Sequence, residues 1–149
     1  MQNQIENTEA DKYESLKLKN QVCFPLYAAS REILRKYTPF LKKLNLTYTQ
    51  YIVMMVMWED KKLTVGELGK KLFLDTGTLS PLLKSMEEKG LVERNREKVD
   101  ERVVKISITK NGENLKEKAL EIPPQICSCL KISTEEAEVL YKLLYKILN

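Results

Sequence analysis

The pattern of hydrophobic and polar positions changes its period between Thr64 and Thr109. Apolar residues first recur at helical spacing in two short segments, of which the second ends before Gly90. From Val104 to Ile108 apolar and polar residues then alternate, as they do in a half-buried strand. The pattern predicts two short helices followed by a two-stranded hairpin.

Capping residues mark where both short helices begin. Thr64 and Glu67 have the spacing of a capping box, and Asp75 precedes the second helix. This order of elements is typical of a winged helix-turn-helix and predicts a mainly α (α+β) fold. The second helix would then be the recognition helix, because its first residues are small or polar and can approach phosphates and bases. Its candidate DNA-binding residues are Thr76, Thr78, Ser80 and Lys84.

A polar segment from Glu93 to Arg102 predicts the tip of the hairpin. It contains Arg94 and Arg102, and a slender loop that ends in arginine suits the negative potential of a narrow minor groove. The plainer interpretation, a small α+β core with a solvated charged loop, also fits this stretch.

Further helical patterns flank this unit. Thr47 and Gln50 form a capping box for a supporting helix whose predicted buried face is Ile52, Val53, Val56 and Met57. Longer apolar stripes cover residues 16–44 before it, then 110–126 and 134–148 after it. Because long striped terminal helices usually pair, we predict a homodimer whose two recognition helices meet successive turns of a palindromic DNA site.

Composition narrows the classes of function. A chain of 149 residues, 43% hydrophobic and 31% charged, predicts one domain, and a net charge of +4 is compatible with nucleic acid. With no histidine, no glycine-rich phosphate loop and no paired-carboxylate motif, we predict no enzyme activity and no cofactor. The acidic first 15 residues predict a flexible tail, and the longest apolar run is too short for a membrane. We expect a soluble, cytoplasmic protein with no membrane partner.

Three cysteines cannot complete a set of disulfides within one chain. Cys23 and Tyr27 are four residues apart and share a helix face. Tyr37 would lie about 21 Å from Cys23 along a straight helix, which is too far for contact within one chain. Only a second copy, crossing antiparallel near Ser30, would bring Tyr37 to Cys23. Hydroxyl donors stabilise a thiolate, which is the form that attacks peroxides. The alternative is that Cys23 is an inert packing residue.

Five segments between about Leu18 and Leu120 form a recognisable combination: Cys23-Phe24 to Tyr27, Tyr37, Leu46–Tyr51, Asp75–Lys84 and Asp100-Glu101-Arg102. Together they resemble the MarR family, specifically its organic hydroperoxide sensing repressors. The Asp100-Glu101-Arg102 wing tip is common to the broad family, whereas an early cysteine followed by three tyrosines is specific to the thiol peroxide sensors.

The resemblance implies a single MarR-like domain over residues 1–149. Its tail would be 1–15, its dimerisation helices 16–44 and 110–149, and its winged-helix region 47–109. Cys23 would be the redox-sensing thiol, bonded by Tyr27 of its own subunit and by Tyr37 and Tyr48 of the partner. Arg94 and Arg102 would contact DNA from a wing whose tip holds Asp100.

The family also implies an output. The reduced dimer would repress a peroxide-detoxification gene, and an organic hydroperoxide would oxidise Cys23. A disulfide, or a mixed disulfide with a low-molecular-weight thiol, would then release the operator DNA. Cys127 and Cys129 are candidate resolving cysteines, although two residues apart on a helix they cannot both face one way.

Two features leave alternatives open. Pro25 beside the thiol would either start or kink the first helix. A MarR-like repressor whose dimer cleft binds an aromatic effector, with Cys23 structural, is the alternative function. A metal sensor is less favoured, because three thiols without histidine fall short of a four-ligand zinc site, and we predict no metal site.

Overall fold

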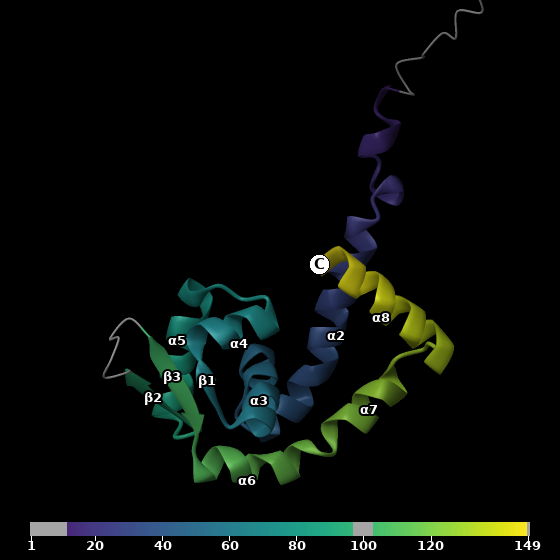
Figure 1. Cartoon of the computed structure of the whole chain (residues 1–149). Coiled ribbons are helices and arrows are strands. Elements are labelled where there is room, and N and C mark those ends of the chain that lie inside the picture. Colours follow the sequence, from purple (N-terminus) through teal and green to yellow (C-terminus); the bar gives the residue numbers. More distant parts are fainter. Residues whose placement is uncertain (1–11, 97–102, 149) are drawn as a thin grey trace, which may run out of the picture. The chain divides into compact units, whose positions relative to one another are not determined.

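The computed structural model describes residues 12–96 and 103–148. The chain divides into two compact units, Met1–Lys36 and Tyr37–Asn149. Two short 3-10 helices, η1 (Glu14–Leu16) and η2 (Leu18–Asn20), precede the long helix α2 (Cys23–Lys43), which contributes residues to both units. Figure 1 labels the elements from α2 onward.

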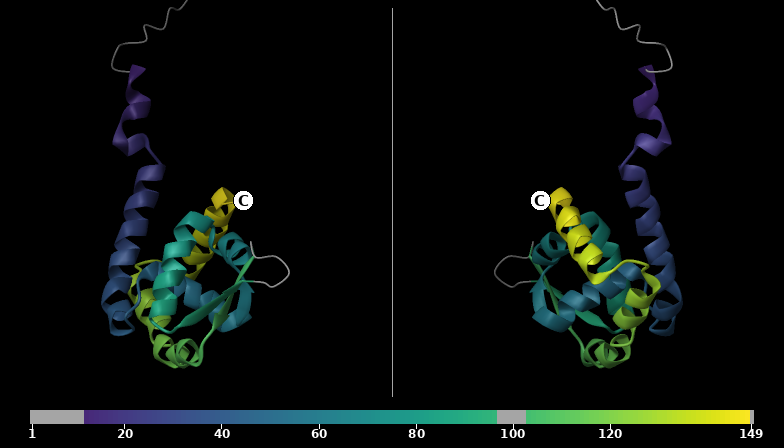
Figure 2. Two further views of the ribbon diagram at one scale, coloured as in Figure 1. Left: turned by 90° about the vertical axis from the view of Figure 1, so that its left-hand side faces the viewer. Right: turned by 90° about the vertical axis from the view of Figure 1, so that its right-hand side faces the viewer.

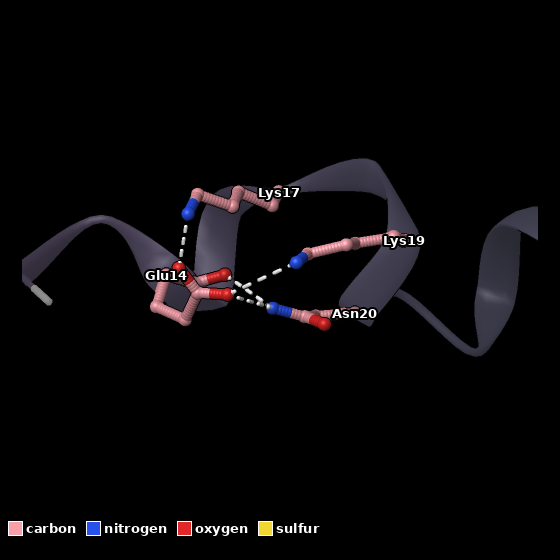
Figure 3. A network of polar contacts seen from close by, with 4 residues as sticks. All are labelled: Glu14, Lys17, Lys19 and Asn20. Atoms are coloured by element: carbon pink, nitrogen blue, oxygen red, sulfur yellow. Dashed lines mark hydrogen bonds and ion pairs between the residues drawn. The ribbon is translucent and has the colours of Figure 1, made fainter. Parts of the chain in front are cut away.

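In the first unit, the side chain of Glu14 ties η1 to η2 (Figure 3). Its carboxylate accepts hydrogen bonds from Lys17 and Asn20 and lies 3.6 Å from the Lys19 ammonium. The Asn20 amide also donates to the Glu14 carbonyl over 2.7 Å. These contacts hold the polypeptide in two separate turns before α2 begins.

The helix that we predicted from residue 16 therefore begins later, at Cys23. Pro25 falls in its first turn, where amide hydrogens have no partner within the helix and a proline is tolerated. Because a proline also disfavours helical geometry in the residue before it, it works against a continuous helix from residue 16. Of the two effects that we considered for Pro25, the structure shows the helix start.

The second unit contains a three-stranded antiparallel sheet in the order β1-β3-β2. Its strands are β1 (Lys62–Thr64), β2 (Val92–Arg96) and β3 (Val104–Ile108). The fully buried Ile106 of the central strand pairs with Leu63 on one side and Arg94 on the other. Three helices lie beside the sheet (Figure 1): α3 (Tyr48–Asp60), α4 (Val65–Leu72) and α5 (Thr76–Glu88).

Two expectations about the sheet were wrong. We assigned Glu93–Arg96 to the hairpin tip, but these residues form most of β2. A strand at the edge of a sheet can be polar because its backbone hydrogen bonds come from the neighbouring strand. The short strand β1 was also missed, since three residues are too few to show a period of two.

The capping predictions are confirmed. The Thr47 side chain accepts from the Gln50 amide, and that of Thr64 from the Glu67 amide, each as half of a complete capping box. Gly90, with φ of 68°, follows α5 as its pattern predicted. The resulting helices pack around one core; its fully buried large side chains are Met54, Met57, Leu68, Leu79, Leu83, Met86, Ile106, Val53 and Val92. The predicted face of α3 was only half right, because Met54 is buried and Ile52 is partly exposed.

Three helices follow the sheet: α6 (Lys110–Ala119), α7 (Ile122–Cys129) and α8 (Thr134–Leu148). The helical pattern predicted over 110–126 is divided between α6 and α7, and Pro123 and Pro124, which fit a bend, lie in the first turn of α7. In Figure 2, α8 is the yellow helix near the carboxyl end. It has no buried residue in the chain alone. None of the helices in the described ranges combines the length and apolar character needed to cross a bilayer.

Candidate DNA-binding surface and thiol site

The amino end of α5 is exposed and well ordered by its own hydrogen bonds. Asp75 caps the helix, and its carboxylate accepts from both the amide and the hydroxyl of Thr78, each over 2.8 Å. These bonds, the hydroxyl first, lower the pKa of Asp75. The Ser80 hydroxyl donates to the Thr76 carbonyl over 2.8 Å. The result is a rigid polar helix end with a negative charge at its cap.

Three of the predicted DNA-binding residues meet around one hollow of about 360 Å³. Thr76 and Ser80 of α5 line it together with Arg94 of β2 and the start of α4. Thr78 and Lys84 are exposed on α5 but do not line this hollow. Arg102 and Asp100 lie outside the described residues, so their predicted roles stay predictions.

Arg94 is bound within the protein by a residue that sequence reasoning missed. Its guanidinium donates to Glu87 Oε2 through Nε at 3.0 Å and through a terminal nitrogen at 2.8 Å. The Arg94 amide donates to Glu87 Oε1 over 2.9 Å. This arginine lowers the pKa of Glu87 and joins β2 to the recognition helix. Its side chain is half-buried beside the hollow rather than at the wing tip.

Cys23 is the first residue of α2, and its thiol is free and exposed. Tyr27, one turn later, is also exposed. The guanidinium of Arg31 lies over the Tyr27 ring, 5.5 Å from its centre, and donates to its hydroxyl over 3.3 Å. An exposed thiol at the start of a helix is open to a dissolved oxidant.

The second unit gathers aromatic rings at the start of α3. The Tyr37 and Tyr48 rings lie 4.9 Å apart, and Tyr51 is 5.9 Å from Tyr37. Burial, then the neighbouring Tyr48 and Tyr51 and Cys127, raises the pKa of Tyr37 to about 12. Burial also raises the pKa of Tyr48. Both phenols are therefore neutral near pH 7 and keep a hydroxyl hydrogen to donate. We call Tyr37, Tyr48 and Tyr51 the tyrosine cluster.

The two remaining thiols lie in α7. Cys127 and Cys129 are both free and exposed, so either can meet a second sulfur at the protein surface. Cys127 is close enough to Tyr37 to contribute to its raised pKa. Across residues 12–96 and 103–148, no group of three or more histidine, cysteine, aspartate or glutamate residues could hold a metal ion.

A second hollow, of about 340 Å³, opens between α3 and α6. Tyr51, Met55 and Trp58 give it an apolar floor, and Glu59 and Lys116 place opposite charges at it. Its size falls within the range of small-molecule sites.

Comparisons with known proteins identify the family. A family model described as "Transcriptional regulator SarA/Rot" matches residues 35–119. An organic hydroperoxide resistance transcriptional regulator of Bacillus subtilis (strain 168) is 49% identical over 139 residues, covering 93% of this chain and 95% of that protein. The chain belongs to the MarR family of transcriptional regulators. Because its relatives are regulators, the prediction that it is not an enzyme is confirmed.

Solved structures agree with this family and with the winged-helix fold. Reduced AbfR bound to DNA is 36% identical with a TM-score of 0.75, covering 91% of this MarR-family chain and 95% of that one. The disulfide form of AbfR, a Staphylococcus epidermidis protein, is 34% identical with a TM-score of 0.64, covering 95% and 100%. The predicted mainly α (α+β) winged helix-turn-helix class is thus confirmed.

Proposed function

We propose that this MarR-family regulator is a dimeric repressor that senses organic hydroperoxides through Cys23 and releases operator DNA when Cys23 is oxidised. The observation that carries the proposal is the exposed, free Cys23 thiol at the amino end of α2. This chain is 49% identical to a regulator named for organic hydroperoxide resistance. The dipole at the start of a helix favours a negatively charged group, as a thiolate is.

The chemistry balances without a metal or cofactor. The Cys23 thiolate attacks one peroxide oxygen, the O–O bond breaks, and the other oxygen leaves as an alcohol after taking a proton. The product is a sulfenic acid. A second thiol then attacks its sulfur, an S–S bond forms and water leaves. Cys127 or Cys129 of the partner subunit, or a low-molecular-weight thiol, would supply that second sulfur.

The partner subunit would complete the thiol site. Tyr27 would bond to Cys23 within the subunit, and Tyr37 and Tyr48 would do so from the partner. The proximity of the Tyr37 and Tyr48 rings, 4.9 Å apart, supports this, since two neutral phenols side by side could both donate to one thiolate. The exposed apolar side chains of α8, among them Val139, Leu143 and Ile147, support a dimer because a second copy would cover them.

The DNA partner would be a palindromic duplex. Thr76, Thr78, Ser80 and Lys84 of α5 would face the major groove, and the wing with Arg94, Asp100 and Arg102 would approach the minor groove. Support comes from the exposed polar end of α5 and from the DNA-bound AbfR structure of similar fold. Arg94 would reach DNA while still paired with Glu87, or after exchanging that partner for a phosphate.

The test is retention of DNA before and after cumene hydroperoxide, with a duplex selected from a random-sequence pool by the reduced protein. We expect the native protein to release the duplex and Cys23→Ser to keep it. Cys127→Ser and Cys129→Ser, compared separately, identify the resolving thiol. Release of Cys23→Ser by peroxide would contradict the proposal.

A second candidate function is regulation by an aromatic effector, which the aromatic hollow between α3 and α6 favours. Salicylate and EDTA are therefore added in parallel. Release of both the native protein and Cys23→Ser by salicylate, with no effect of peroxide, would replace the redox proposal with this one. Release by EDTA would instead require a bound metal.

A further inference from the structure

One buried amide joins the tyrosine cluster to the recognition helix. Gln50 is only 3% exposed and is the one buried polar side chain in the part of the chain that the structure describes. It lies in the first turn of α3, between Tyr48 and Tyr51. Its amide nitrogen donates to the Ser85 hydroxyl over 3.3 Å, which connects it to α5. Both helices are labelled in Figure 1.

The ammonium group of Lys89 makes the connection charged. Lys89 caps the carboxyl end of α5 and donates to Gln50 Oε1 over 2.9 Å. It also donates to the Asn45 carbonyl over 2.7 Å, in the turn that precedes α3. One acceptor from the turn before α3 and one from its first turn thus converge on one cation at the end of α5. Hydrogen bonds with an ionised donor are stronger than neutral ones.

We propose that Gln50 and Lys89 are positioning residues that transmit displacement of the tyrosine cluster to the recognition helix. This inference rests on the proposed function, in which Tyr48 responds to the state of Cys23. Tyr48 and Gln50 share the first turn of α3, so a shift of the Tyr48 ring displaces that turn. Gln50 cannot leave Lys89 and Ser85 without leaving its own buried amide without these partners, which is costly, so α5 follows.

Apolar packing alone would transmit less. Met57 of α3 and Leu83 of α5 belong to the same buried core, and apolar packing of this kind is non-directional. The polar link has fixed donors and acceptors and therefore a defined geometry. Helix α5 has 13 residues, so at 1.5 Å per residue Thr76 lies about 20 Å from Lys89. A tilt of α5 at Lys89 therefore displaces its other end, where Thr76 would face DNA.

The test uses Lys89→Met, which keeps the length of the side chain and removes its charge. The Kd for the selected duplex is measured with reduced protein and after cumene hydroperoxide. For reduced Lys89→Met we expect a Kd within about threefold of the Kd of the reduced native protein. The ratio of the oxidised to the reduced Kd should be about tenfold smaller in Lys89→Met than in the native protein, a change within the usual range of coupling free energies. Lys89→Arg, which keeps the donors, should restore most of the ratio. Lys118→Met, an exposed lysine of α6, should leave it unchanged.

A second test is a double-mutant cycle that needs no peroxide. Tyr48→Leu perturbs the tyrosine cluster directly, and its effect on Kd is measured with Lys89 present and with Lys89→Met. We expect the effect to shrink severalfold in the absence of the ammonium, so that the two substitutions are not additive. Ser85→Ala repeats the cycle if Lys89→Met does not fold, which melting temperatures will show.

The outcomes separate the two claims. If peroxide does not release the native protein but the Tyr48 and Lys89 effects are non-additive, the proposed function fails and the link stands. If the native protein is released, while Lys89→Met retains the full ratio and the cycle is additive, the link is wrong. A fall in melting temperature with an unchanged ratio would assign Lys89 a stabilising role only, and would likewise overturn the inference.

Discussion

Gly112 lies where α6 meets the sheet, and we predict that Gly112→Ala destabilises the fold. A Cβ atom at this position would lie 2.3 Å from the Leu91 carbonyl oxygen and 2.9 Å from Ile108 Cγ1. That carbonyl cannot move freely, because it accepts from the Thr109 amide over 3.1 Å. Helix α6 would have to move by roughly 1 Å, which strains the bond from Trp58 Nε1 to the Gly112 carbonyl, now 2.8 Å.

The magnitude follows from these contacts. Overpacking costs about 1–3 kcal/mol and a lost neutral hydrogen bond about 1 kcal/mol, while alanine returns up to about 1 kcal/mol of helix propensity. We expect a loss of about 2 kcal/mol in the free energy of unfolding and a fall in Tm of roughly 4–8 °C. Urea unfolding followed by fluorescence of the single Trp58 measures it, at one fixed protein concentration.

Gly66→Ala is the matched control for Gly112→Ala. At Gly66 the nearest atom to an added Cβ is Thr64 Oγ1 at 4.0 Å, so the site has room. We expect it to be neutral or to add up to about 1 kcal/mol. Equal stabilities for the two alanine variants would refute the argument from close packing at Gly112.

Three further outcomes are expected. Asp75→Asn keeps an N-cap but removes the carboxylate at the amino end of the recognition helix, so gel retention should show severalfold tighter DNA binding. Weaker binding would contradict the placement of this helix end against the DNA phosphates. Glu87→Gln weakens the pairing with Arg94, and hydrogen exchange should show faster opening of β2 with little change in α4; unchanged β2 protection would count against the role of this pair. The folded-state pKa of Tyr37 exceeds the ordinary value of 10, so the folded protein retains a proton that the unfolded one loses, and stability present below pH 10 should fall as the pH rises towards 12. Tyr37→Phe should flatten that part of the pH profile, and an identical slope in both proteins would contradict the assignment.

The elements that the sequence predicted well are those specified by local signals. A cap and its partner lie three residues apart, as in Thr64 and Glu67, and both capping boxes lie at the expected helix starts. The sequence predicted the hairpin but not that β2 continues to Arg96, because its neighbour β3, rather than an alternating pattern of its own, holds these polar residues in the sheet. Pro123 and Pro124 indicated a bend near the end of the helical pattern over 110–126, but the apolar stripe runs on to Ile122 and did not show that α6 ends at Ala119.

The same distinction between local signals and contacts distant in the chain applies to the candidate site. The exposed polar end of α5 follows from residues adjacent in the chain, and the sequence indicated it. The contact between Gln50 and Lys89 joins residues 39 apart, and it depends on how α3 packs against α5. The pairing of Arg94 with Glu87 depends on β2 lying beside the recognition helix. Neither contact has a signature in the spacing of residues.

The most direct test of the central claim compares two fractions in one peroxide titration. Mass spectrometry gives the fraction of Cys23 held in a disulfide, and fluorescence anisotropy of a labelled duplex gives the fraction of DNA released. We predict that the two rise together and that both stay at zero in Cys23→Ser. Complete release of DNA while Cys23 remains a thiol, or complete disulfide formation with the duplex still bound, would contradict the account.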